Sequence, residues 1–283
     1  MGMELSNTAI NRIGDTIRRG KNCPGYDDAV KTLNSWREAH GGLMDKYYDK
    51  CVKLCREDVF KNILIAQRLK RLPTIIGKIN RFKTMRLSSM QDVAGVRIIV
   101  RDMEQLHLIE NRIKRWKNLY KVRDYIRAPK SDGYRSKHFI FKQDGMFVEI
   151  QLRTQIQHIW ATSVETVDIF NNTSIKFGEN KSYWYKFFQQ TSSAFAIIEG
   201  TNPIRIYMGK TVDEICQIIK GTMNDHDIDW KLRTIDVAKQ VSLDKRIDSK
   251  VYYIVLELNA RKNNCYITGF REDNYDAAVQ KYQ

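Results

Sequence analysis

Two acidic side chains lie at strand-like segments near the middle of the 283-residue chain. Asp92 lies just before one such segment, and Glu149 lies within another, two residues before Gln151 and four before Arg153. Because side chains alternate along a strand, we expect Glu149, Gln151 and Arg153 to share one face. Two carboxylates on one sheet face suit Mg²⁺, which prefers a few carboxylates together with phosphate oxygens. The alternative interpretation is a structural network of ion pairs on an exposed face.

A loop at residues 127–138 combines positive charge with turn-forming Pro, Asp and Gly. Its Tyr134 offers a ring that could stack on a nucleobase. Side chains beside it could reach phosphate or sugar groups, namely Lys130, Arg135 and His138. The alternative is a basic surface turn with a half-buried tyrosine.

The chain has a large excess of positive charge, with 48 Lys and Arg against 33 Asp and Glu, a net charge of +15. Such a charge attracts polyanions, whether nucleoside triphosphates, RNA or a membrane surface. Residues 67–91 hold seven basic side chains and no acid, and a second basic cluster follows at residues 112–123. A solvated helix face is the usual reason for such runs. Here the runs flank the two carboxylates, which favours a role in binding.

Apolar residues at three-to-four spacing predict several helices. The predicted helices are Asn7–Arg19, a pair at Tyr26–His40 and Leu43–Cys55 broken at Gly41-Gly42, Met103–Leu119, and further helix from Thr154 to about Glu199. Pro73 is expected in the first turn of another helix that begins near Thr74, whose hydroxyl can help to cap it.

Between these helices, β-branched and aromatic residues predict strands. The predicted strands are Gly95–Val100, Val122–Ile126, Ser136–Lys142 and Met146–Arg153, with a hairpin turn at Asp144-Gly145. The middle of the chain is therefore predicted to be a helix-flanked sheet, and the fold class to be α+β.

The Gly and Pro positions divide the chain into three predicted parts. We expect an N-terminal helical extension at residues 1–25, a main domain at 26–200 and a small α+β domain at 201–283. The last part is predicted to contain a helix from Val212, a hairpin around Arg261–Asn264 and a final helix at Tyr275–Tyr282. The sequence offers no C-terminal cap for that final helix, which is compatible with a longer natural chain.

The remaining composition predicts a cytoplasmic protein with no membrane partner. The apolar runs are too short for a membrane span, and the first residues do not resemble a secretion signal. The five cysteines lack the spacing of a zinc site and are expected to be reduced thiols.

Four blocks of residues, in order, resemble the synthetase domain of RelA/SpoT-type alarmone enzymes. The first two are Arg68-x-Lys70 with Thr74-Ile75 and Lys78, and Asp92-Val93-Ala94-Gly95-Val96-Arg97. The other two are Asp124-Tyr125-Ile126 through Pro129-Lys130, Gly133-Tyr134 and His138, and Val148-Glu149-Ile150-Gln151-Leu152-Arg153-Thr154. The resemblance covers roughly Tyr26–Glu199, so the 26–200 part is identified as a pyrophosphokinase domain of this kind.

The resemblance implies a nucleotidyltransferase-like mixed sheet and transfer of the β,γ-pyrophosphate of ATP to a ribose 3′-hydroxyl, with release of AMP. It implies that Asp92 and Glu149 bind Mg²⁺ and that Glu149 also takes the proton of the attacking hydroxyl. The implied ATP-binding side chains are Arg68 and Arg97 around the adenine and Lys70 and Lys78 at the phosphates.

On the acceptor side, the resemblance implies that Tyr134 stacks on the base with help from Lys130 and His138. The implied supporting side chains are Gln151 and Arg153. Asp132 stands where many members of the family have an asparagine that takes part in guanine recognition.

Two further positions depart from the family pattern. Thr74 replaces a serine and keeps its hydroxyl, while Glu165-Thr166 replaces a Glu-His pair. The five scattered histidines give no metal-dependent His-Asp hydrolase domain, so the chain resembles a small, synthesis-only member.

Two enzymatic hypotheses follow. In the first, GDP or GTP is the acceptor and the product is a guanosine tetra- or pentaphosphate. In the second, the chain resembles toxic relatives that modify the 3′-terminal adenosine of tRNA, which the positive charge would accommodate. A third hypothesis is a binding module without catalysis, against which the two intact carboxylates argue. Residues 204–283 are expected to regulate activity, as a fused antitoxin or a sensor for a protein partner.

Overall fold

The computed structural model describes residues 6–56, 63–171, 183–224, 252–259 and 264–271. The chain divides into two compact units, each described here by itself. The sheet unit comprises Met1–Val100, Gln105–Arg123 and Lys137–Leu152, and the helical unit comprises Arg101–Glu104, Asp124–Ser136 and Arg153–Gln283.

A mixed five-stranded sheet is the centre of the sheet unit, with strand order β1-β2-β5-β4-β3. The strands are β1 (Leu64–Leu69), β2 (Ala94–Val100), β3 (Leu119–Asp124), β4 (Lys137–Gln143) and β5 (Met146–Thr154). The predicted α+β class is confirmed, and three of the four predicted strands lie within a residue of their expected bounds. At the β4–β5 turn, Asp144 and Gly145 have φ of 50° and 74°, the conformation that Asp-Gly favours in two-residue hairpins.

Helix α4 (Met103–Ile113) and strand β3, which is shifted from the predicted Val122–Ile126, differ in their bounds from the prediction, and strand β1 was not predicted. The helix ends six residues earlier than expected, and β3 starts at Leu119. Asn118 has a φ of 68°, a conformation that asparagine tolerates and that ends the turn after the helix. Strand β1 was missed because it is an edge strand whose side chains are mostly exposed, so it lacks an apolar alternation.

The predicted helix break at Gly41-Gly42 is wrong, because α2 (Tyr26–Cys55) is one continuous helix of 30 residues. Two glycines inside a helix cost about 1 kcal/mol each relative to alanine. Buried residues on both sides, including Leu33 and Tyr47, hold the helix to the core and outweigh that cost.

The N-terminal helix α1 (Asn7–Arg19) is confirmed, and its cap Ser6 accepts a hydrogen bond from the amide of Ala9. The helix α3 (Leu72–Arg81) has Pro73 in its first turn, as expected, but its cap is Arg71 and not Thr74. One apolar cluster joins α1, α2 and α3 with the short 3-10 helix η1 (Leu87–Ser89).

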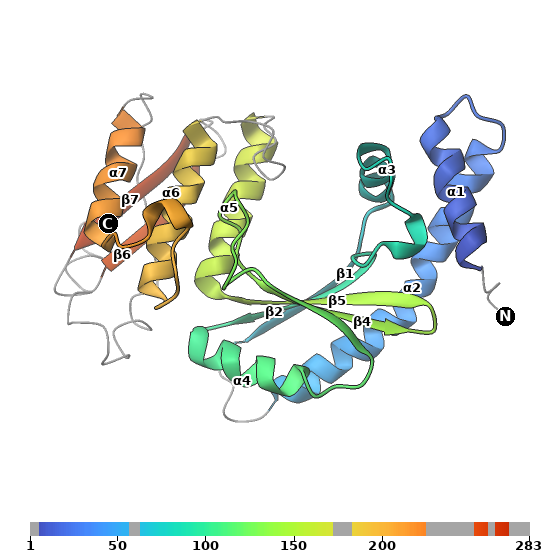
Figure 1. Ribbon diagram of the computed structural model, residues 1–283, viewed down its shortest axis with the longest axis horizontal. Coiled ribbons are helices and arrows are strands. Elements are labelled where there is room, and N and C mark those ends of the chain that lie inside the picture. The colour runs from blue at the N-terminus through green and yellow to red at the C-terminus, as the bar shows by residue number, and fades with distance from the viewer. Residues whose placement is uncertain (1–5, 57–62, 172–182, 225–251, 260–263, 272–283) are drawn as a thin grey trace. The chain divides into compact units, whose positions relative to one another are not determined.

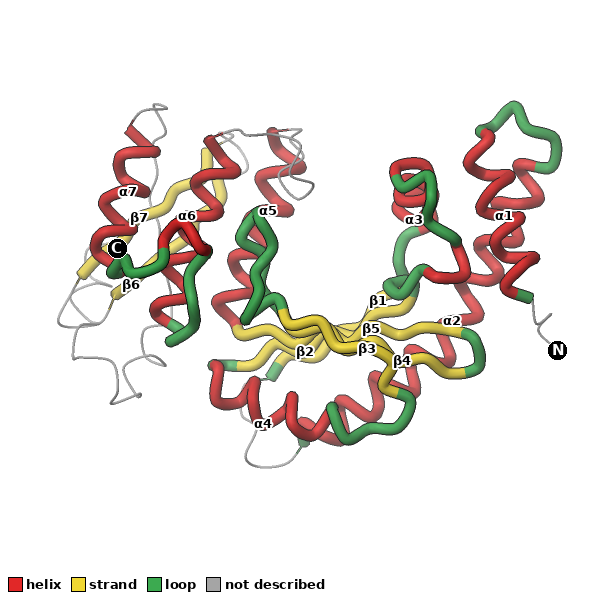
Figure 2. The backbone as a smooth tube through the Cα atoms, viewed as in Figure 1, coloured by secondary structure: helices red, strands yellow, loops and turns green. Residues whose placement is uncertain are grey.

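Helices α2 and α4 lie against one face of the sheet (Figures 1 and 2). Phe141 of β4 packs on Tyr47 of α2, with ring centroids 4.7 Å apart. In the β4–β5 register, Phe139 and Phe141 lie opposite Ile150 and Val148. These residues therefore point towards the helices, and the alternate positions of both strands point to the other face of the sheet.

The helical unit contains α5 (Gln155–Asn171), α6 (Tyr183–Ile198), η3 (Arg205–Tyr207), α7 (Val212–Asn224), β6 (Tyr252–Asn259) and β7 (Asn264–Arg271). Its core joins Trp160 of α5, Phe187 and Phe188 of α6, and Ile215 and Ile219 of α7. The helix from Val212 is confirmed, and β6 and β7 pair antiparallel as the predicted hairpin requires. The predicted helix at Tyr275–Tyr282 lies outside the described residues. None of the described helices is long and apolar enough to cross a membrane.

Candidate active site

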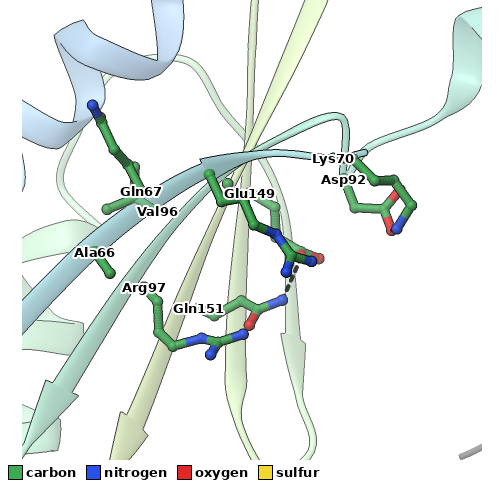
Figure 3. A pocket seen from close by; sticks show the side chains of 10 residues that line it. Ala66, Gln67, Lys70, Asp92, Val96, Arg97, Glu149 and Gln151 are labelled. Atoms are coloured by element: carbon green, nitrogen blue, oxygen red, sulfur yellow. Dashed lines mark hydrogen bonds and ion pairs between the residues drawn. The ribbon is translucent and has the colours of Figure 1, made fainter. Parts of the chain in front are cut away.

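A pocket of about 260 Å³ lies in the sheet unit (Figure 3). Its Glu149 and Gln151 lie opposite Ile140 and His138 in the register, on the face that side-chain alternation places away from α2 and α4. Residues of β1, β2, β5 and the segments that follow β1 and precede β2 line it. The lining residues are Ala66, Gln67, Arg68, Lys70, Asp92, Gly95, Val96, Arg97, Glu149 and Gln151. Both predicted carboxylates, three of the four predicted ATP-binding cations and the predicted amide therefore share one pocket.

Two arginines reach this pocket from neighbouring strands. In the antiparallel β1–β2 register, Arg97 lies opposite Ala66. Arg68, two residues further along β1, lies opposite Gly95. Side-chain alternation puts both guanidinium groups on the same face, at diagonal positions. Because Gly95 has no side chain, the space beside Arg68 stays open for a planar group.

Asp92 is the most positively surrounded carboxylate of the pocket. Its oxygens accept hydrogen bonds from Lys70 at 2.9 Å and from Lys78 at 2.8 and 2.9 Å. Burial by itself raises the pKa of Asp92, but the charges and hydrogen bonds of the two lysines outweigh it and lower the pKa below its ordinary value. Asp92 is therefore ionised at neutral pH, and α3 contributes Lys78 to the edge of the pocket.

Glu149 is 6% exposed and hydrogen-bonds two neighbours on the same face. Its Oε1 lies 2.8 Å from Nδ1 of His138, and its Oε2 accepts a hydrogen bond of 2.7 Å from Gln151. Burial raises the pKa of Glu149, as does the nearby negative charge of Asp92. The interactions with His138 and Gln151 lower the pKa by more than this, so the net shift is downward. Glu149 is thus an ionised carboxylate that is held by two hydrogen bonds and interacts electrostatically with Asp92.

These two carboxylates fit a magnesium ion better than a metal held by protein alone. Among the described residues there is no group of three or more His, Cys, Asp and Glu that could hold a metal. A cation at Asp92 and Glu149 would therefore need other oxygen ligands, and Mg²⁺ in nucleotide enzymes takes them from phosphate and water. In the structure both oxygens of Asp92 are paired with lysines, which could move to phosphate groups when a cation binds.

Beneath His138, on the helix-facing side of β4, lies a buried ion pair that sequence analysis missed. Lys137 is 2.5 Å from Glu110 of α4, and both are less than a tenth exposed. Lys114 adds a second contact to Glu110 at 2.7 Å. Lys137 and His138 are consecutive and point to opposite faces, so this pair fixes β4 at the point where it supports Glu149. Sequence spacing gives no signal for a contact between residues 27 apart.

In the helical unit, Tyr134 lies among cations. The Nζ of Lys130 is 4.7 Å from its ring centroid, and the guanidinium carbon of Arg153 is 4.9 Å from it. Arg153 also donates a hydrogen bond of 2.6 Å to the Tyr134 hydroxyl. Tyr125 packs edge-on to Tyr134 at 5.8 Å and shares Lys130 with it. Of the cations expected beside Tyr134, the structure thus places Lys130 at the ring, together with Arg153 and with Tyr125, which sequence analysis did not single out. His138, which was expected there too, instead contacts Glu149 in the sheet unit.

Asp132 shapes the turn before Tyr134. It is 7% exposed, and its Oδ1 accepts a hydrogen bond of 2.8 Å from the Tyr134 amide. An asparagine would offer the same side-chain oxygen, so the departure at Asp132 is compatible with the same turn. Its expected part in base recognition stays a prediction.

The predicted site residues thus form two groups. The sheet unit holds Arg68, Lys70, Lys78, Asp92, Arg97, His138, Glu149 and Gln151, and the helical unit holds Lys130, Asp132, Tyr134 and Arg153. Each group is assembled within its own unit, and the role of each residue stays a prediction.

Residues 67–170 match the family model described as "Region found in RelA / SpoT proteins". An uncharacterised protein of Mycobacterium tuberculosis is 28% identical over 187 residues, which are 62% of this chain and 63% of that protein. GTP pyrophosphokinase YwaC of Bacillus subtilis is 33% identical over 111 residues, which are 34% of this chain and 52% of that protein. The chain therefore spans about half to three fifths of the length of these relatives.

Solved structures share the fold. Small alarmone synthetase 1 from Bacillus subtilis, bound to its product pppGpp, has a TM-score of 0.51 and 22% identity and covers 68% of this chain and 98% of its own. Small alarmone synthetase 2 from the same organism has a TM-score of 0.50 and 20% identity and covers 67% of this chain and 98% of its own. At such identities the likeness shows the fold alone.

Proposed function

We propose that this chain, whose residues 67–170 are a RelA/SpoT region, transfers the β,γ-pyrophosphate of ATP to the ribose 3′-hydroxyl of GDP or GTP. The observation that carries the proposal is one pocket with two ionised carboxylates, Asp92 and Glu149, beside two arginines. The similarity to proteins named GTP pyrophosphokinase supports the choice of a guanine nucleotide.

We assign the pocket to ATP. Arg68 and Arg97 stand on one face of the sheet, where planar guanidinium groups can stack on the two sides of an adenine. Lys70 and Lys78 neutralise the triphosphate once a cation has taken their place at Asp92. A magnesium ion bound by Asp92 and Glu149 would supply positive charge to the phosphate oxygens.

The reaction is a displacement at the β-phosphorus of ATP. The acceptor 3′-oxygen forms a bond to the β-phosphorus, the bond from this phosphorus to the oxygen shared with the α-phosphate breaks, and AMP leaves with that oxygen. We assign the proton of the 3′-hydroxyl to Glu149. His138 and Gln151 hold one oxygen each of that carboxylate, which fixes its direction.

We assign the acceptor base to Tyr134. Its ring is oriented by Arg153 at the hydroxyl and by Tyr125 at its edge. Lys130 lies over this ring and could move to the acceptor phosphates. The base would then take the ring face that Lys130 leaves.

A second candidate acceptor is the 3′ end of tRNA. It is favoured by the basic side chains around the end of α4, where Lys114, Arg115, Lys117 and Lys121 are all exposed. Such a surface suits a nucleic-acid backbone, and binding to it would weaken steeply with salt. Nucleotide acceptors would show a much smaller dependence on salt.

We also propose a regulatory role for residues 204–283, as a fused inhibitor or the receiver of a protein partner. Deleting the whole chain after Pro203 is a poor test of this role. It would remove Tyr207, Ile215 and Ile219, which pack into the same core as α6. A deletion that keeps α7 and removes residues 225–283 is the better test. Increased transfer by the shortened protein would support regulation, and unchanged transfer would contradict it.

The proposed function is tested by offering γ-labelled ATP and Mg²⁺ with GDP, GTP and deacylated tRNA in parallel. We expect label in the guanine nucleotides, and its loss in Glu149→Gln. Glu38→Gln is the matched control, because Glu38 is exposed on α2. Label in tRNA alone would replace the acceptor, and no label in any acceptor would refute the transfer.

A further inference from the structure

The loop 124–136, which carries Lys130, Asp132 and Tyr134, is held by α6. Gln189 donates a hydrogen bond of 2.5 Å to the carbonyl of Ser131. Ser192 donates one of 2.6 Å to the carbonyl of Gly133 and accepts one of 3.1 Å from Nε of Arg135. Alternate residues of the loop (Ser131, Gly133 and Arg135) are therefore hydrogen-bonded to α6. Their partners Gln189 and Ser192 are three positions apart and lie on one face of the helix.

The loop lies very close to α6 at Gly133. Gly133 has a φ of +100°, and a Cβ at this position would lie 2.8 Å from the Cβ of Ser192 and 3.0 Å from Cζ2 of Trp160. Trp160 in turn donates a hydrogen bond of 3.0 Å to the carbonyl of Phe188. Helices α5 and α6 thus pack so closely on Gly133 that any larger residue there would force these atoms or the loop to shift.

Arg135 closes the loop from inside. It is 3% exposed, and its Nη1 donates a hydrogen bond of 3.2 Å to the carbonyl of Ile126 near the start of the loop. Burial lowers the pKa of Arg135 to about 10, opposed by the charge of Glu199, so the guanidinium stays positive at neutral pH. Glu199 is hydrogen-bonded by Thr154 and Gln157. A charged anchor therefore joins the two ends of the loop to α6.

We infer that Gln189 and Ser192 are positioning residues that set the affinity for the acceptor nucleotide by fixing the loop of Tyr134. The inference rests on the assignment of the acceptor base to Tyr134. Helix α6 begins at Tyr183, beyond the matched region 67–170, so the chain supplies this support from outside that region. Neither residue touches ATP or the pocket of the sheet unit in this assignment, so the ATP affinity should not depend on them.

Adjacent serines provide a matched pair of variants. Ser192→Ala removes the hydroxyl that holds Gly133 and Arg135. Ser193→Ala makes the same exchange at a residue that is also buried, but its hydroxyl donates to Gln189 within α6 and accepts from the amide of Ile204. Gln189→Met is a second variant, which removes the amide donor at an exposed bond and keeps the side-chain length.

The experiment measures KM and kcat for ATP and for GDP, together with GDP binding by titration calorimetry on the full chain. Loss of the two hydrogen bonds that the Ser192 hydroxyl makes to the loop predicts a rise of about five- to tenfold in KM and Kd for GDP for Ser192→Ala. Gln189→Met should give a smaller rise of the same kind. The KM for ATP should stay within about twofold, and Ser193→Ala should behave like the wild type.

GDP constants that do not change in both Ser192→Ala and Gln189→Met would overturn the inference, as would equal changes for ATP and GDP. If the wild type binds GDP but transfers nothing to it, the proposed activity fails while the calorimetric comparison still decides the role of α6. If the wild type does not bind GDP at all, both fail.

Discussion

Replacement of Gly133 by alanine tests the close contact between the acceptor loop and α6. Three atoms would lie 2.8 to 3.1 Å from the new Cβ, namely Ser192 Cβ, Trp160 Cζ2 and the Phe188 carbonyl oxygen. Carbon atoms pack best at about 3.5–4.0 Å, so the wall or the loop must move. Such overpacking costs about 1–3 kcal/mol. The positive φ adds about 1–2 kcal/mol for any residue with a Cβ.

The expected loss for Gly133→Ala is therefore about 2–5 kcal/mol in the free energy of unfolding. Gly209→Ala is the matched control, because Gly209 lies in the same unit with a φ of +79° and would place its Cβ within 4 Å of nothing. The control should lose only the backbone part, about 1–2 kcal/mol. The lower entropy of the unfolded chain favours both variants equally and cancels in the difference.

Urea unfolding of the two variants and the wild type measures the two losses. Gly133→Ala should be less stable than Gly209→Ala by about 1–3 kcal/mol. It should also bind GDP more weakly, because the loop of Tyr134 is displaced. Equal losses of stability in the two variants would show that Gly133 is not in close contact with α6. The proposal that α6 positions the loop of Tyr134 would then be contradicted.

Three further predictions concern the sheet unit. The pKa values of Asp92 and Glu149 are lowered in the fold, so their stabilisation is present above the ordinary carboxyl pKa of about 4 and is lost as the pH falls through the lowered values. Between pH 7 and pH 3, the urea midpoint should therefore fall less in Asp92→Asn than in the wild type. An equal fall would contradict the lowered pKa of Asp92. Glu110→Gln should cost about 3–5 kcal/mol by urea unfolding, because it breaks the buried pair with Lys137, whereas replacing both by apolar residues should cost much less; a small single loss would refute the pairing. Gly42→Ala should stabilise the protein by up to about 1 kcal/mol in the same assay, because its Cβ meets nothing in a continuous helix, and a loss would indicate that the helix is broken there.

The parts of the fold that local patterns determine could be predicted from the sequence. The alternation in β5 predicted that Glu149 and Gln151 share a face, and both line the pocket. The Asp144-Gly145 turn was predicted because few residues other than Asn, Asp and Gly tolerate its positive φ values.

The rest depends on contacts between distant residues. The edge strand β1 has no apolar alternation, since most of its side chains are exposed. Burial of Leu33 and Tyr47 carries α2 through Gly41-Gly42 against the local preference of glycine. The bonds of Gln189 and Ser192 to the loop join residues almost 60 apart, and no spacing rule in the sequence points to them.

Analysis of the nucleotide products from ATP and GDP tests the transfer of a pyrophosphate group most directly. The protein is incubated with ATP, Mg²⁺ and GDP, and the products are separated and quantified over time. We predict AMP and a guanosine nucleotide with a 3′-diphosphate in equal amounts, with none of either in Glu149→Gln. Formation of ADP with a 3′-monophosphate, or no guanosine product, would contradict the displacement at the β-phosphorus.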